Sequence, residues 1–119
     1  MSHDDFMAFE QGSDLIKAGQ FAQALPLLLE SFTKQPHFLT ATYLSLCYDA
    51  ASDRSASLVW SGVAYALNPR HGKAATTFAK QLIVWDEECR AREVLEAALM
   101  HQPDCMDARE LLAQLDGSR

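Results

Sequence analysis

Three prolines recur at nearly equal intervals along this chain of 119 residues, and their spacing restricts the fold more than any other feature. Pro36, Pro69 and Pro103 lie 33 and 34 residues apart. Each one closes an apolar segment with helical spacing, at residues 24–35, 57–68 and 91–102. Proline has no amide hydrogen, so it suits a helix boundary better than a helix interior. A period of this length is typical of stacked helical hairpins.

Small and large side chains follow the same period. Small residues stand 5, 12 and 24 positions before each proline: Ser31, Ala64 and Ala98; Ala24, Ser57 and Ala91; Gly12, Ser45 and Ala79. A large residue stands 21 positions before each proline: Leu15, Tyr48 and Leu82. Small side chains at fixed sites let two helices pack closely. The pattern therefore predicts two alternating helices in each unit.

Periodicity and boundary residues predict seven helices, at about residues 4–18, 22–34, 37–51, 54–67, 71–84, 88–101 and 104–115. Gly19 suits a helix C-terminus because glycine tolerates a left-handed backbone. Pro26 is expected to bend the first turn of its helix without ending it. The last helix has Ala108, Leu111, Leu112 and Leu115 on one stripe, which predicts a cap with a polar outer face.

This pattern resembles the tetratricopeptide repeat (TPR) family, whose units are helix pairs of 34 residues with a terminal proline. Family positions are matched in the first unit by Gly12, Leu15, Gly19, Phe21, Ala24 and Pro36, in the third by Ala79, Leu82, Ala91, Leu95, Ala98 and Pro103, and in the second by Tyr48, Ala64 and Pro69. The chain departs from the family at Ala8, Ala41 and Ala75, where an aromatic is usual, and at Ser52, where glycine is usual.

The resemblance implies an all-α fold. It predicts a right-handed alpha-alpha superhelix of three TPR-like helix pairs plus a C-terminal capping helix. The whole chain, residues 1–119, would form a single TPR-like domain with units at about 5–37, 38–70 and 71–104 and a cap at 105–116.

In that family the first helix of each pair lines a concave groove. The corresponding positions here are Phe6, Phe9, Ser13, Leu39, Thr42, Tyr43, Leu46, Asp49, Lys73, Thr76, Thr77, Lys80 and Ile83. The resemblance implies a protein-protein interaction module that binds a peptide or helix of a partner protein in this groove. Large side chains supply most of the energy of an interface, so Phe9, Tyr43 and Leu46 are the expected anchors. Lys73 and Lys80 offer ammonium groups to an acidic group of the partner.

Co-chaperone domains of the same family clamp the terminal carboxylate of heat-shock chaperones with five lysine, asparagine and arginine side chains. Those positions read Phe9, Ser13, Tyr43, Lys73 and Thr77 here. One ammonium cannot replace a set of charge-assisted donors. The sequence therefore predicts that this chain has no such clamp.

The second helix of the second unit is almost entirely apolar over residues 58–66. If Val59, Trp60 and Val63 faced water, they would form an exposed patch of the kind that marks a contact surface. Homodimerisation or a second partner site is the resulting hypothesis, and packing of Trp60 against a neighbouring helix is the alternative. Trp85, beside Asp86, is expected to plug the turn of the third unit rather than lie on its rim.

Two further functions stay open alongside the interaction module. The layout is similar to bacterial type III secretion chaperones, which shield apolar subunits before export. A self-assembling structural subunit of a larger complex would use the face from Val59 to Val63. An enzyme is not expected, because the only nominal motif, Ser31 to Lys34, lacks the companion motifs of its enzyme class. His101 and Cys105 complete no metal-ligand set, so neither a metal nor a cofactor is predicted.

Charge and composition argue against two classes of partner, nucleic acids and membranes. Sixteen acidic and ten basic side chains give a net charge of −6, which repels phosphate backbones and argues against nucleic acid. No secretory signal and no apolar run of about 20 residues occurs, so no membrane insertion is expected. Three cysteines without a short spacing, Cys47, Cys89 and Cys105, suit a reducing compartment. The predicted location is cytoplasmic.

Overall fold

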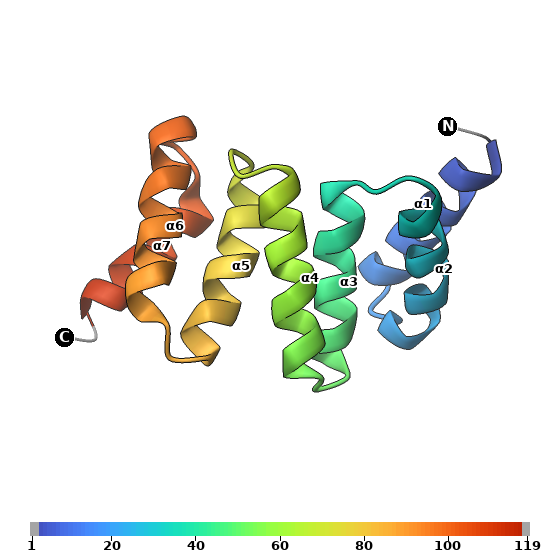
Figure 1. Cartoon of the computed structure of the whole chain (residues 1–119), viewed down its shortest axis with the longest axis horizontal. Helices are drawn as coiled ribbons and strands as arrows, with labels where there is room; N and C mark the ends of the chain where they lie inside the picture. The colour runs from blue at the N-terminus through green and yellow to red at the C-terminus, as the bar shows by residue number, and fades with distance from the viewer. Residues whose placement is uncertain (1–2, 118–119) are drawn as a thin grey trace.

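Seven helices make up the structure, a computed structural model that describes residues 3–117 and side chains from Met7 onward. They are α1 (His3–Lys17), α2 (Phe21–Lys34), α3 (Phe38–Ala50), α4 (Arg54–Leu67), α5 (Gly72–Val84), α6 (Glu88–His101) and α7 (Met106–Gly117) (Figure 1). Every predicted helix is confirmed within two residues at each end. No strand occurs among the described residues.

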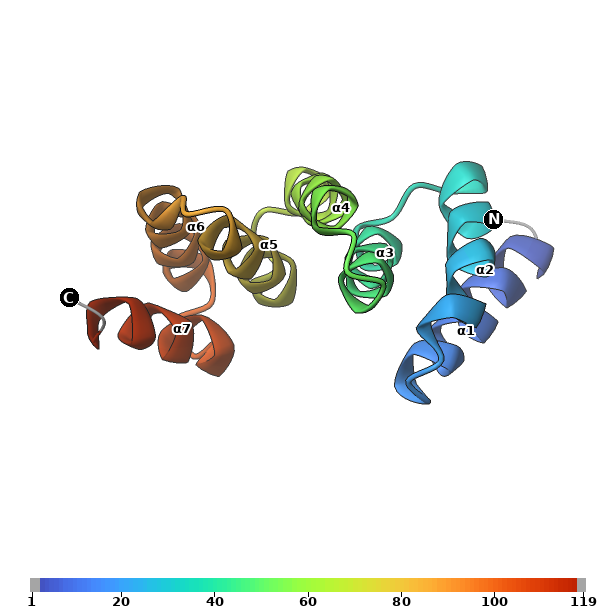
Figure 2. The ribbon, with the colours of Figure 1, turned by 90° about the horizontal axis from the view of Figure 1, so that it is seen from below.

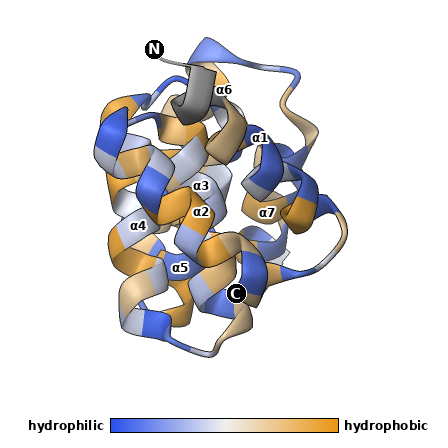
Figure 3. Ribbon diagram, turned by 90° about the vertical axis from the view of Figure 1, so that its right-hand side faces the viewer, coloured by the Kyte–Doolittle hydropathy of each residue, from blue (hydrophilic) through white to orange (hydrophobic). Residues whose placement is uncertain are grey.

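The helices follow one another along the long axis of a body that measures 47 × 29 × 22 Å (Figure 1). Each helix packs against the next one in the chain, and α3 also contacts α1 and α5. Seen from below, α3, α5 and α7 lie on one side of the row and α4 and α6 on the other (Figure 2). The first helices α3 and α5 therefore share one face with the cap α7, and α1 contacts α3. The view along the row shows that the helices carry both hydrophobic and hydrophilic residues and that the connecting segments are partly hydrophilic (Figure 3).

The buried core is divided among the contacts between units. One cluster joins α2 to α3 through Leu28 and Leu44, which are both 0% exposed. A second joins α3, α4 and α5 through Ala41, Ala64 and Ala74. The third unites α5, α6 and α7 and includes Phe78, Leu82, Leu95, Leu111 and Leu115. Because each cluster draws side chains from neighbouring units, no unit buries its apolar surface alone.

Two of the three sets of predicted small residues, those 12 and 24 positions before each proline, lie in the contact between the two helices of a unit. In the first unit a Cβ atom on Gly12 would come within 2.7 Å of Leu28 Cδ2, so any larger residue there would force the Leu28 side chain to shift. In the second unit Ser45 and Ser57 meet: each hydroxyl donates to the other residue's carbonyl oxygen, at 2.9 and 3.0 Å. Both serines are buried, and these bonds satisfy their hydroxyls. The third unit places Ala79 and Ala91 at the same two positions, and both are fully buried.

The turn between the paired helices has the same hydrogen bonding in all three units. The amide of Gln20 donates to the Leu15 carbonyl at 2.8 Å, and the equivalent bonds are Asp53 to Tyr48 at 2.9 Å and Glu87 to Leu82 at 2.8 Å. Each turn contains one residue with positive φ: Gly19 at 77°, Ser52 at 62° and Asp86 at 60°. This is the helix-terminating geometry that favours glycine. The helix α2 continues through Pro26, as predicted.

Replacing Ser52 by glycine should stabilise the protein. A left-handed backbone costs a residue with a Cβ atom about 1–2 kcal/mol, and glycine avoids this cost. Glycine loses more conformational entropy on folding, which offsets part of the stabilisation. We expect Ser52→Gly to raise the free energy of unfolding by about 0.5–1 kcal/mol in urea denaturation. Gly19→Ala is the matched control and should lower it by about 1 kcal/mol. A decrease for Ser52→Gly would show that the serine side chain stabilises this turn.

Candidate functional site

Side chains from three different units meet on the face that the first helices share. The rings of Phe9, on α1, and Tyr43, on α3, are stacked with centroids 6.0 Å apart and an interplanar angle of 24°. The ammonium nitrogen of Lys73, on α5, lies 5.6 Å from the centroid of the Tyr43 ring. Residues far apart in the sequence thus form a continuous row of two rings and a cation across α1, α3 and α5.

Three more predicted groove residues extend this row along the helices. Leu39 and Leu46 lie four residues before and three residues after Tyr43, so they share its stripe on α3, and both are half-buried. Lys80 follows Lys73 by two helical turns and is exposed. We call Phe9, Leu39, Tyr43, Leu46, Lys73 and Lys80 the inner face. It is apolar on α1 and α3 and cationic on α5.

The two lysines of the inner face are available for an anionic group. Neither has a salt bridge among the residues that the structure describes. Lys73 rests over the π-face of Tyr43, a contact that is worth about 0.5–1 kcal/mol at an exposed site. That contact directs the ammonium toward the rings, and it is weak enough to be exchanged for a carboxylate.

Three predicted groove residues prove to be buried. Ser13, Thr42 and Thr76 are 8%, 0% and 4% exposed. The hydroxyl of Thr42 donates to the Phe38 carbonyl at 2.8 Å, and that of Thr76 donates to the Gly72 carbonyl at 2.7 Å. These bonds within one helix satisfy the hydroxyls and make burial tolerable. The expectation that these three side chains face a partner is corrected, since almost none of their surface is accessible.

The remaining predicted groove residues lie at the margins. Ile83 is half-buried and packs against the cluster of α5, α6 and α7. Thr77 donates its hydroxyl to the Lys73 carbonyl at 2.8 Å, and Asp49 is exposed. The side chain of Phe6 lies outside the described residues.

The predicted second interface on α4 is largely packed inside. The ring of Trp60 meets that of Phe32, on α2, edge to face at a centroid distance of 4.9 Å. Val63 is half-buried against the cluster of α3, α4 and α5. Only Val59 is exposed, at 61%. Trp60 is therefore a packing residue between the first and second units, and the patch of three side chains facing water does not form.

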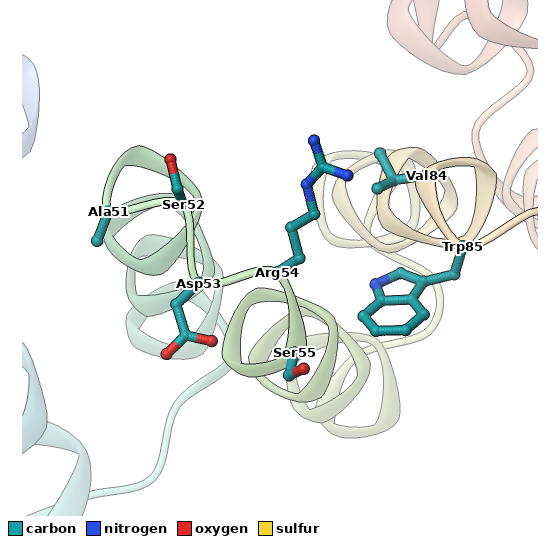
Figure 4. A pocket seen from close by; sticks show the side chains of 7 residues that line it. All are labelled: Ala51, Ser52, Asp53, Arg54, Ser55, Val84 and Trp85. Atoms are coloured by element: carbon teal, nitrogen blue, oxygen red, sulfur yellow. The ribbon is translucent and has the colours of Figure 1, made fainter.

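Trp85 lies on the rim of the third unit, so the prediction that it plugs the turn is wrong. It is 45% exposed at the end of α5. Together with Val84, Arg54 and Ser52 it borders a surface cavity of about 510 Å³ between the α3–α4 turn and the end of α5 (Figure 4). A similar cavity of about 450 Å³ lies one unit earlier. No sequence pattern indicates either cavity, because each forms only where two units meet.

The thiol of Cys47 borders that earlier cavity but is shielded from solvent. Burial raises its pKa from 9.0 to about 11, because desolvation disfavours the thiolate. Cys89, in contrast, is exposed.

This difference predicts selective labelling. Since the thiolate is the reactive form, a thiol reagent at pH 8 should modify Cys89 rapidly and Cys47 only after denaturation. Mass spectrometry of digested samples taken over time measures both rates. Equal rates for the two cysteines in native buffer would contradict the burial of Cys47.

The packing of Trp60 also predicts a stability difference between neighbouring residues on α4. We expect Trp60→Ala to lower the free energy of unfolding by about 2–4 kcal/mol, because a large cavity would remain beside Phe32. Val59→Ala, on the exposed side, should change it by less than about 0.5 kcal/mol. Thermal and urea denaturation compare the two, and a stable Trp60→Ala variant would show that the indole is not part of the core.

Within the described residues no group of three or more histidine, cysteine, aspartate or glutamate side chains is placed to hold a metal ion. None of the helices in the described part of the chain is long and apolar enough to cross a membrane.

Solved structures of tetratricopeptide domains match the whole chain. The first TPR of Spaghetti (RPAP3), bound to the HSP90 peptide SRMEEVD, has a TM-score of 0.87 at 18% identity and covers 99% of this chain and 94% of its own. The TPR2B domain of yeast Sti1, in a pHsp70 complex, has a TM-score of 0.86 at 15% identity and covers 99% and 100%. The Sgt2 TPR domain from Aspergillus fumigatus has a TM-score of 0.86 at 12% identity and covers 98% and 80%.

Comparison by sequence gives no such match. No protein-family model matches the chain, and no curated protein sequence matches it significantly. The structural matches confirm the predicted fold: this is an all-α tetratricopeptide-type repeat superhelix.

Proposed function

We propose that this chain is a protein-interaction module that binds a peptide or helix of a partner protein along its inner face. The observation that carries the proposal is the row formed by Phe9, Tyr43 and Lys73 across three units. Structurally similar domains support it: the first TPR of Spaghetti was solved with an HSP90 peptide and the second TPR domain of human RPAP3 with an HSP70 peptide. The proposal assigns no catalytic step to the chain.

The physical basis is apolar surface held in place by rigid helices. Phe9, Tyr43 and Leu46 are each half-buried, so part of each side chain stays accessible for a partner to cover. Burial of apolar surface contributes roughly 25 cal/mol per Å². The side chains lie on helices rather than loops, so less conformational entropy is lost when a partner binds.

The contacts at Trp60 favour this proposal over self-assembly through α4. The ring of Trp60 packs on Phe32. Of the three residues predicted to form an interface on α4, only Val59 is exposed. The inner face, in contrast, combines half-buried apolar side chains with two exposed lysines, Lys73 and Lys80. That combination is what a specific peptide site requires.

Truncation of the rings tests the proposal. Peptides selected from a display library against the wild-type protein should bind Phe9→Ala and Tyr43→Ala about 10- to 100-fold more weakly, because each change removes a central apolar anchor. Fluorescence anisotropy measures the affinities, and circular dichroism checks that each variant keeps its helices.

Val59→Ala is the matched control, since it removes an exposed apolar group from the opposite helix of a unit. Its affinities should equal those of the wild type. Unchanged binding by both ring variants, or loss of binding in the control, would move the site away from the inner face.

A further inference from the structure

We infer that the inner face selects an extended partner segment in which a large apolar side chain and an acidic side chain stand two residues apart, with no need for a free C-terminal carboxylate. This inference rests on the proposed function and adds the chemistry of the ligand to it. Three observations carry it: the spacing of the row, the sign of its charges and the arrangement of the neighbouring polar groups.

The spacing fits alternate residues of an extended chain. The Phe9 and Tyr43 rings are 6.0 Å apart, and the Lys73 ammonium is 5.6 Å from the Tyr43 ring. In an extended chain, side chains two residues apart point the same way and are separated by about 6.6 Å. An apolar side chain against the two rings would therefore place the side chain two residues away beside Lys73.

The charges fit an acidic group at that second position. Lys73 and Lys80 are exposed and without salt bridges among the described residues. Elsewhere the chain carries an acidic excess, with a net charge of −6, which disfavours nonspecific adhesion of acidic segments. The α5 side of the inner face is thus a local exception to the charge of the whole chain, and a carboxylate there gains a charge-assisted contact.

The polar groups nearby cannot assemble the donor set that a chain terminus needs. Ser13 is buried, and the Thr77 hydroxyl already donates to the Lys73 carbonyl of its own helix. Phe9 and Tyr43 occupy two other positions where donors would be required, and their rings stack on each other. A single ammonium can pair with an aspartate or glutamate side chain inside a segment, so an internal acid is sufficient for the contact that we infer.

The test uses three acetylated, C-terminally amidated nonapeptides in a glycine-serine background. The first contains Leu-Ser-Glu and the second contains Leu-Ser-Lys. The third has three residues between its leucine and its glutamate. NMR titration of the labelled protein measures weak as well as tight binding. We expect the first peptide to bind at least about tenfold more tightly than the other two, with shifts centred on Phe9 and Tyr43.

Charge reversal supplies the decisive variant. Lys73→Glu should invert the preference, so that the Leu-Ser-Lys peptide binds more tightly than the Leu-Ser-Glu peptide. Lys73→Met, which keeps an apolar chain over Tyr43, should bind both equally and controls for loss of packing. Circular dichroism verifies the fold of each variant.

The outcomes separate the inference from the function beneath it. If all three peptides bind alike or not at all, while display-selected peptides still require Phe9 and Tyr43, the inference fails and the proposed function stands. If the display-selected peptides bind the Phe9→Ala and Tyr43→Ala variants as tightly as the wild type, the proposed function itself is overturned. The peptide SRMEEVD adds a last comparison: equal affinity of its free-acid and amidated forms supports the inference, and binding of the free acid alone overturns it.

Discussion

Close approach of the two helices within each unit is the constraint on which the rest of the molecule depends. It is met in three different ways: by Gly12 against Leu28, by reciprocal hydrogen bonds between Ser45 and Ser57, and by an alanine pair in the third unit. Each solution removes side-chain bulk where the helices cross. Because the crossings repeat, successive units stack with the same orientation, and their first helices come to share a face.

The shared face follows from that stacking rather than from any single contact. The paired helices end with one hydrogen-bond geometry in every unit, with donors at Gln20, Asp53 and Glu87. Identical turns keep the first helices in register along the row. This register brings the Phe9 ring of α1 to 6.0 Å from the Tyr43 ring of α3, and the Lys73 ammonium of α5 to 5.6 Å from that same Tyr43 ring.

Sequence reasoning predicted the helices well because several of their ends are marked locally, by proline between the units and by Gly19 within the first unit. It also selected Phe9, Tyr43 and Lys73, although their contact depends on superhelical geometry. It could not predict that the Thr42 side chain is buried. A threonine hydroxyl that donates to a carbonyl of its own helix is satisfied whether the side chain is buried or faces solvent. It left two positions open for Trp60, because its partner Phe32 comes from a different unit and the space between them forms only when the units stack.

The paired serines of the second unit have a mechanical consequence. Hydroxyl-to-carbonyl bonds are directional, so α3 and α4 resist sliding past each other along their axes. At the equivalent crossings of the flanking units, Gly12 and the alanine pair fit by shape alone, which restrains sliding less. Sliding of the paired helices along their axes is therefore most restricted in the middle unit, which carries Tyr43, the ring that contacts both Phe9 and Lys73.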